Sequence, residues 1–300
     1  MWFNNVIIYQ CEHPNPDSIN QLLEDKRLKP CPPHARFSLG WLSPTTSPDL
    51  IHIVAGSSMV CFGKEERILP RGVIKRLLNE QIEAREAQRG YAMKRAERAQ
   101  LAEELEFELL PKAFCIQKRL PAILDHMSNR LFINTSSANQ ASQIIALLRQ
   151  SIPDIHIEPL PPIHALHEQF TRWVKDPNTL PPAFQLGSQC MLVALDDEKK
   201  RFQCKGYELP AEQVTSLLEK GLCVTELSLI WNERIEFTLT PDLTLKRIKC
   251  LDYLVDEFND IHQQETEDEQ ENAALILLSG ELRALANDVL KINGPSASST

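Results

Sequence analysis

The stretch LCVTELSLIWNERIEFTLTPDLTLKRIKC, residues 222–250, decides the fold class because it predicts three β-strands in succession. The strands are expected at 222–231, 233–239 and 243–250, and the turns between them are too short to hold a helix. Strands joined by such short turns pair in an antiparallel sheet. A doubly wound α/β protein would instead place a helix between successive strands. The stretch therefore favours an α+β fold.

On either side of this stretch, strands and helices follow one another without a regular βαβ cadence. Strands are expected at 6–9, 37–42, 50–55, 58–63, 113–118, 122–127, 130–135, 183–187, 190–195 and 200–206. Helices are expected at 17–25, 137–150, 164–175, 211–220 and 272–291. This order predicts mixed antiparallel sheets rather than one parallel sheet.

Residues 70–110 differ from the rest of the chain because they are helical in pattern throughout. A hydrophobic stripe at helical spacing begins the segment, formed by Ile74, Leu77, Leu78 and Ile82. Gly90 is the expected break between two helices, and charged residues dominate around it. The segment therefore predicts a protruding helical arm.

Prolines at 153, 159, 161 and 162 mark the expected internal boundary. We expect an N-terminal α+β domain made of residues 1–70 and 111–160, with the arm at 71–110 between its two parts. Residues 161–300 are expected to form a C-terminal α+β domain that ends in an acidic helix.

The net charge of −9 is unevenly distributed. Residues 252–300 hold eleven acidic residues against two basic ones, whereas residues 1–251 are balanced. The overall acidity therefore does not exclude a nucleic-acid partner for the body of the protein.

The eight cysteines occur singly, without any CxxC pair, and most lie in hydrophobic runs. This pattern favours buried free thiols in a reducing compartment over a disulfide framework. The first residues lack a basic segment followed by a cleavage site, and no hydrophobic run approaches the roughly 18–20 residues of a membrane span. We therefore expect a cytosolic protein without a membrane partner.

The sequence contains no motif typical of catalysis. With only ten glycines it has neither GxGxxG nor a Walker A motif, and GxSxG and HExxH are also missing. We therefore expect no enzyme activity, no catalytic residue and no cofactor. Cys11 and His13, together with Cys31 and His34, are the best candidates for a zinc site. The first spacing is tight for such a site, so two ordinary thiols and two surface histidines are the favoured interpretation.

Two clusters of basic residues carry the main functional signal. Between Arg71 and Gln100 there are eight basic and four acidic residues, with Arg85 and Arg89 four positions apart. Lys246, Arg247 and Lys249 form a second cluster on a predicted strand, where alternation would put Arg247 and Lys249 on one face. Cations on rigid elements suit phosphate contacts that read no bases. Salt-bridged, solvated helices have much the same composition, so this alternative stays open.

Ten short motifs, in order and over nearly the whole chain, resemble the RdgC family of bacterial recombination-associated proteins. They are MWF with Asn5 at 1–5, LGW at 39–41, KEERILP at 64–70, VIK at 73–75, LLPKAF at 109–114, ALLR at 146–149, WV at 173–174, FQL at 184–186, LKRIK at 245–249 and SGEL at 279–282.

The resemblance implies a homodimer that closes into a ring around double-stranded DNA, binds it without sequence preference, opposes loading of the RecA recombinase and associates with the nucleoid. It assigns Phe114 to the subunit contact, although the residues alone would place Phe114 in the core. The predicted DNA-binding residues are Lys75, Arg76, Arg85, Arg89, Lys94, Arg95, Arg98, Lys112, Lys118, Lys205, Lys246, Arg247 and Lys249.

Three positions depart from the family pattern. Asn4 and Glu226 stand where the family commonly has lysine, and Gly72 stands where it often has proline. These differences predict weaker DNA affinity. The alternative function is a protein-interaction scaffold that docks through the arm without binding DNA, and a nuclease built from scattered carboxylates ranks third.

Overall fold

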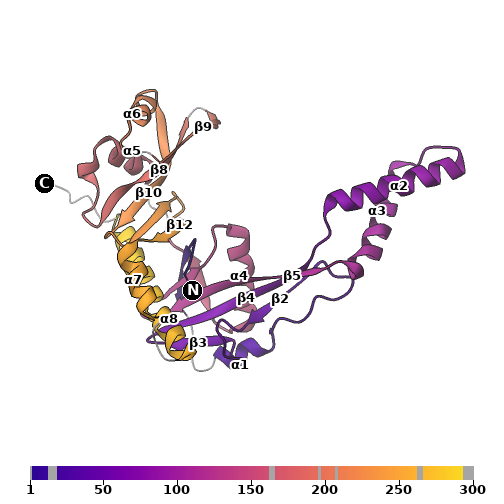
Figure 1. Cartoon of the computed structure of the whole chain (residues 1–300), viewed down its shortest axis with the longest axis horizontal. Coiled ribbons are helices and arrows are strands. Elements are labelled where there is room, and N and C mark those ends of the chain that lie inside the picture. The colour runs from indigo at the N-terminus through magenta and orange to yellow at the C-terminus, as the bar shows by residue number, and fades with distance from the viewer. Residues whose placement is uncertain are drawn as a thin grey trace.

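The computed structural model describes residues 2–12, 19–161, 166–194, 197–206, 209–261 and 266–292, leaving out the side chains of residues 197–199. Two antiparallel sheets and eight α-helices make up this part of the chain, which confirms the α+β class. Figure 1 shows the helical arm and the smaller sheet at opposite ends of the larger sheet, both rising on the same side of it. The described chain therefore has the shape of a crescent with a concave side.

The larger sheet has seven strands in the order β2-β4-β5-β6-β1-β7, with β3 paired to β4. They are β1 (Ile7–Glu12), β2 (Phe37–Leu42), β3 (Ile51–Val54), β4 (Ser57–Arg67), β5 (Cys115–Asp125), β6 (Arg130–Ile133) and β7 (His156–Pro159). The prediction of separate strands at 113–118 and 122–127 is wrong, because β5 runs through Pro121. The missing N–H of Pro121 is tolerated there because β6 pairs only with residues 122–125.

Both faces of the seven-stranded sheet are covered over part of its length. On one face, α1 (Ile19–Glu24) and α4 (Ala138–Ser151) form a core with Val60, Phe62 and Leu124. On the other face, α8 (Glu267–Lys291) packs its Leu275 and Leu278 into a core that contains Met59 and Ile123. The strands are hydrophobic on both faces in this region because helices lie on both sides.

The smaller sheet has five strands in the order β12-β11-β10-β8-β9. They are β8 (Phe184–Ala194), β9 (Asp197–Lys205), β10 (Leu222–Trp231), β11 (Ile235–Leu239) and β12 (Leu245–Cys250), with α5 (Leu166–Lys175) and α6 (Glu212–Glu219) against β10. The predicted succession of three strands at 222–250 is confirmed. Residues 183–187 and 190–195 belong to one strand rather than two, and both β7 and α7 (Asp252–Ile261) were missed.

The N-terminal segment and α8 join the two sheets. Val6 exchanges two backbone hydrogen bonds with Leu245 of β12, 2.8 and 2.9 Å long, and the chain then enters β1 of the larger sheet. The core under the five-stranded sheet continues along α8 to Ile123 of the larger sheet. The expected domain boundary near residue 160 stays a prediction.

The arm consists of α2 (Arg71–Arg89) and α3 (Arg95–Leu109), and a short 3₁₀ helix at Leu110–Lys112 follows α3. A second short 3₁₀ helix, at Pro177–Thr179, follows α5 and is not part of the arm. Gly90 ends α2 with φ of 77°, a left-handed conformation that favours glycine, so the predicted break is confirmed. Ile82, Met93 and Leu101 form a small core of their own between the two helices. Within the described residues, no helix is long and apolar enough to span a membrane.

Candidate nucleic-acid interface

The cations of the arm divide into two groups by their contacts. Arg89 lies 3.3 Å from Glu97 and Arg98 lies 2.9 Å from Glu86, so these pairs link α2 to the start of α3. Arg76 is 3.8 Å from Glu80 on the same helix. In the described part of the chain, the remaining four candidates form no ion pair: Lys75, Arg85, Lys94 and Arg95. The arm therefore offers fewer unpaired cations than its composition suggests.

The junction of the arm with the sheet holds two more candidates, and both are paired. Lys112 lies 2.8 Å from Glu108 one helical turn before it. Lys118 on β5 and Lys64 on β4 both contact Glu66, and their hydrogen bonds hold the pKa of Glu66 below its usual value. Beside these residues is a hollow of about 590 Å³, which Lys75 of α2 also lines. Charges of both signs thus meet at the junction of the arm with the larger sheet.

One face of the five-stranded sheet carries the core, and the other is polar. Leu227, Leu229 and Phe237 point to the core that α5, α6 and α8 complete. Figure 1 places α5 at the end of the molecule remote from the arm, so the opposite face is turned towards the concave side. By strand register, this face, which we call the polar face, also holds a few apolar side chains and carries the following residues: Gln185, Gln189, Met191, Val193, Arg201, Gln203, Lys205, Cys223, Glu226, Ser228, Ile230, Glu236, Thr238, Lys246 and Lys249.

The predicted alternation along β12 is wrong, because a β-bulge interrupts it. Lys246 is opposite Thr238 and Lys249 is opposite Glu236, which leaves one residue too many between them. Arg247 adopts φ of 54° in the bulge, and its guanidinium donates to the Thr238 hydroxyl at 3.1 and 3.3 Å. Lys246, Arg247 and Lys249 therefore all lie on the polar face, whereas strict alternation would have turned Lys246 into the core.

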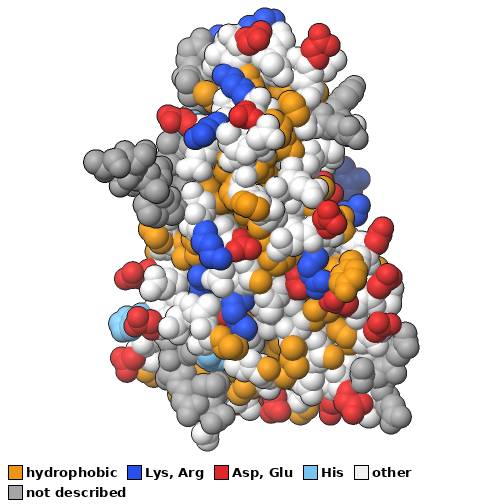
Figure 2. Space-filling model, turned by 90° about the vertical axis from the view of Figure 1, so that its left-hand side faces the viewer, with side chains coloured by type: hydrophobic (Ala, Val, Ile, Leu, Met, Phe, Trp, Pro, Cys, Tyr) orange, Lys and Arg blue, Asp and Glu red, His pale blue; other side chains and the backbone are white. Residues whose placement is uncertain are grey.

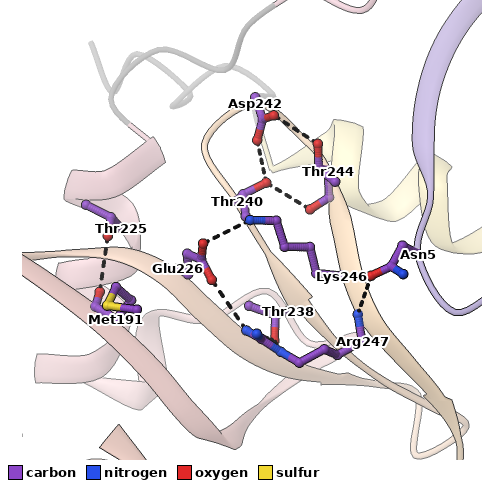
Figure 3. A network of polar contacts seen from close by, with 10 residues as sticks. All are labelled: Asn5, Met191, Thr225, Glu226, Thr238, Thr240, Asp242, Thr244, Lys246 and Arg247. Carbon is purple, nitrogen blue, oxygen red and sulfur yellow. Dashed lines mark hydrogen bonds and ion pairs between the residues drawn. The ribbon is translucent and has the colours of Figure 1, made fainter. Parts of the chain in front are cut away.

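Glu226 of β10 lies between two of these cations. Its Oε1 is 3.0 Å from Nζ of Lys246, and its Oε2 is 3.4 Å from a guanidinium nitrogen of Arg247 (Figure 3). This contact could not be predicted from residue spacing, because Glu226 is about twenty positions from both cations and β10 and β12 are not neighbours in the sheet. Lys205 and Lys249 form no ion pair with any described residue.

Phe114 is 85% exposed, so the interpretation of this residue as core is wrong. It stands between the 3₁₀ turn after α3 and the start of β5, where its carbonyl accepts a hydrogen bond of 2.8 Å from the N–H of Ile68. Phe37, Phe107 and Ile116 are also exposed in this region. A monomer that exposes several large hydrophobic side chains near one another has a surface suited to a partner.

The proposed zinc ligands are only partly within the described residues. Cys11 and Cys31 are buried thiols, and burial raises the pKa of Cys11 to about 12, so this thiol stays protonated at neutral pH. His34 stacks on Phe107 at 4.0 Å between ring centroids, and His13 lies outside the described residues. No cluster of three or more His, Cys, Asp or Glu that could hold a metal ion occurs among the residues described.

Figure 2 shows the face of the molecule at the end remote from the arm. In Figure 2, basic, acidic and hydrophobic side chains are interspersed over this face, and the basic ones form no continuous surface. The polar face of the five-stranded sheet carries Arg201, Lys205, Lys246, Arg247 and Lys249 against the carboxylates of Glu226 and Glu236, and it is thus the best candidate for an anion-binding surface.

Two antiparallel sheets, a helical arm and an open sheet face that carries lysine and arginine define an α+β protein with a candidate anion-binding face. The chain belongs to the RdgC family, whose model, described as "Putative exonuclease, RdgC", matches residues 1–294. The chain is 32% identical over 302 residues to the "Recombination-associated protein RdgC" of Proteus mirabilis, and 31% identical to the proteins of the same name from Yersinia pestis and Yersinia pseudotuberculosis. Each comparison covers 99% of both chains. The resemblance read from the short motifs is confirmed.

Proposed function

We propose that the protein binds double-stranded DNA without sequence preference, as a dimeric ring or clamp that limits access of RecA to the duplex. The observation that carries this proposal is the polar face of the five-stranded sheet. Lys205, Lys246, Arg247 and Lys249 lie on this face, which is turned towards the concave side of the crescent, and no core helix packs against it among the described residues.

Phosphate recognition explains why such a face would bind duplexes of any sequence. Lysine and arginine on a sheet can contact phosphates along the backbone, and these contacts carry no information about base identity. Base reading needs side chains placed in a groove, usually from a helix or a two-stranded ribbon. The four cations are spread over β9 and β12 of a broad sheet, which suits contacts with the backbone.

A dimer is part of the proposal because one crescent encloses only one side of a duplex. Phe114 is the proposed anchor of the subunit contact, and its 85% exposure supports this role. Aromatic residues that are exposed in the subunit and buried on assembly are common anchors of interfaces. Association with the nucleoid would follow from binding DNA of any sequence.

We propose that the protein acts without catalysis, although the family model is described as an exonuclease. A magnesium-dependent nuclease holds its metal ions with clustered carboxylates, and no group of three or more His, Cys, Asp or Glu that could hold a metal ion occurs among the described residues. A magnesium-dependent loss of intact plasmid during incubation with the protein would favour a nuclease.

The alternative function is a protein-interaction scaffold that uses the arm. The contacts of Arg89 with Glu97 and of Arg98 with Glu86 favour it, because those cations then serve the arm itself. Exposed pairs of this kind contribute only tenths of a kcal/mol to about 1 kcal/mol each.

A gel-shift series across salt concentrations tests the proposed function. Unrelated duplexes should bind with nearly equal affinity, and the logarithm of affinity should fall linearly with the logarithm of salt concentration. A preference of more than about tenfold for one sequence, equal to about 1.4 kcal/mol, would contradict non-specific binding. Absence of any binding at low salt would favour the scaffold.

A further inference from the structure

We propose that Glu226 acts as an internal substitute for a DNA phosphate, which occupies Lys246 and Arg247 and thereby sets how tightly the polar face binds. The inference rests on the proposed function, because it concerns the same face and the same ligand. It goes further by dividing four cations of this face into Lys205 and Lys249, which are available, and Lys246 and Arg247, which must first leave a carboxylate.

The contact uses both oxygens of the carboxylate. Oε1 faces Lys246 at 3.0 Å and Oε2 faces Arg247 at 3.4 Å, so one Glu226 engages both cations (Figure 3). The side chain of Glu226 is 24% exposed, whereas those of Lys246 and Arg247 are 30% and 46% exposed. The carboxylate of Glu226 is therefore more buried than the two cations around it, and both cations stay partly exposed to solvent.

The geometry shows that the cations turn inward to reach the carboxylate. Glu226 is on β10 and the cations are on β12, with β11 between them. Neighbouring strands lie about 4.8 Å apart, so the side chains must span roughly twice that distance. Arg247 crosses β11 over Thr238, whose hydroxyl accepts hydrogen bonds from its Nε and Nη2. Both side chains thus lean along the sheet instead of extending from it.

The backbone around Arg247 is fixed from the other side. Its N–H donates to the Asn5 side chain at 3.1 Å, and the N–H of Ile248 donates to the Asn4 carbonyl at 2.8 Å. The bulge is therefore tied to the N-terminal segment, so the direction of Arg247 is set before any ligand arrives. An isolated cation on a flexible strand end would lack this arrangement.

The chemistry of the carboxylate explains the competition. Carboxylate and phosphate both present oxygens that accept charge-assisted hydrogen bonds from arginine and lysine. A phosphate that approaches Lys246 and Arg247 must displace Glu226, and the displaced carboxylate stays on the same face and repels it. A phosphate that binds Lys205 or Lys249 displaces no carboxylate, since no described residue forms an ion pair with these two lysines.

The test replaces Glu226 by glutamine and measures binding of the full chain to one 30-base-pair duplex by fluorescence anisotropy at several salt concentrations. Glu226→Gln keeps the shape and removes the charge. We expect affinity to rise about tenfold at low salt, and the magnitude of the salt slope to grow by about one unit for each cation released.

Glu236→Gln is the matched control. Glu236 lies on the same polar face, and its carboxylate accepts a hydrogen bond from Ser228 at 3.2 Å that glutamine can also accept. The change in net charge is the same as in Glu226→Gln, but no contact with Lys246 or Arg247 is removed. We expect its affinity to rise less than about twofold. Equal gains from the two variants would overturn the inference, because the effect would then be one of net charge alone.

A second comparison does not depend on the Glu226 variant. In the parent, Lys246→Gln with Arg247→Gln should weaken binding less than Lys205→Gln with Lys249→Gln. In the background of Lys246→Gln with Arg247→Gln, the gain from Glu226→Gln should fall to that of Glu236→Gln, because no cation is left to release and only the repulsion of the duplex is removed. Equal losses from the two double variants, or an undiminished gain, would overturn the inference while leaving DNA binding established. Absence of DNA binding in the parent and in Glu226→Gln would overturn the proposed function and the inference together.

Discussion

Arg283 of α8 holds the carboxylate of Asp125 at the end of β5, with Nη2 2.6 Å from Oδ1 and Nε 2.9 Å from Oδ2. Asp125 is fully buried, and it also accepts hydrogen bonds from Ser57 and Ser128. The two residues are 158 positions apart, so the contact fastens the C-terminal helix to the seven-stranded sheet. Residues 252–300 contain only two Lys or Arg residues, Arg283 and Lys291. Arg283 stabilises the fold through its contact with Asp125.

Removing Arg283 should destabilise the protein strongly. Arg283→Met keeps the hydrophobic stem but leaves the buried Asp125 without its cation, and breaking a buried pair in this way typically costs about 3–5 kcal/mol. Urea unfolding measures the change in the free energy of unfolding. Lys291→Met is the control, since Lys291 pairs with Asp288 on the same helix while 75% exposed, and it should cost less than about 0.5 kcal/mol. Similar losses for the two variants would contradict the structural role of the pair.

The same pair should make stability depend on pH in the acid range. Burial by itself would raise the pKa of Asp125, but hydrogen bonds from Arg283 and Ser128 outweigh it and hold the pKa below its usual value. The pair therefore stabilises the protein fully above the unfolded pKa of about 3.9 and loses its effect as the pH falls through the lower pKa of the folded state. We expect the gap in stability between the parent and Arg283→Met to narrow below about pH 4. A constant gap from pH 7 to pH 3 would exclude this cause.

The unpaired cations of the polar face should contribute to DNA affinity. Lys205→Gln with Lys249→Gln is expected to weaken binding uniformly across sequences and to lower the magnitude of the salt slope by about one unit per lost contact. Gel shifts on two unrelated duplexes check both effects. Arg172→Gln with Lys175→Gln makes the same change in charge on α5, behind the sheet, and should leave the slope unchanged. If this control loses as much affinity, the face is assigned wrongly.

Substitutions in the arm distinguish the proposed DNA clamp from the alternative protein-interaction scaffold. Under the clamp, Arg85→Gln with Arg95→Gln should reduce DNA affinity, because these cations form no ion pair with described residues. Arg89→Gln with Arg98→Gln should reduce it less, since Glu97 and Glu86 already occupy them. Anisotropy titrations at one low salt concentration compare the two. Parental affinity in both variants would remove the arm from the DNA path and favour docking of a protein there.

Phe114→Ser should weaken the proposed dimer and leave each chain folded. With 85% of Phe114 exposed, the substitution removes little from the core, whereas an interface aromatic often costs about 2 kcal/mol or more on truncation. Sedimentation velocity measures the assembly, and circular dichroism verifies the fold. Phe202→Ser, at an exposed aromatic of β9, serves as the control and should keep the parental assembly. An unchanged dimer in Phe114→Ser would place the subunit contact elsewhere.

Local pattern was sufficient for most of the elements. The three strands at 222–250, the two-helix arm and its break at Gly90 follow from residue spacing and from the conformational freedom of glycine. The predicted break between strands 113–118 and 122–127 is wrong, because Pro121, a residue type that usually ends a strand, is tolerated inside β5. Pro121 stands inside β5 because its missing N–H faces a side on which β6 has already ended.

Residue spacing predicts less about the candidate DNA-binding face than about the helices and strands. The sequence determined which residues are cations and that the chain belongs with the RdgC family, because composition and short motifs are properties of neighbouring residues. Only the tertiary structure decided which cations are available. The bulge at Arg247 turns Lys246 to the polar face, and the sheet order brings Glu226 to it from β10. Charge–charge contacts extend over a few ångströms in space, whereas strand order in a sheet can bring together residues far apart in the chain, so pairing is invisible in sequence spacing.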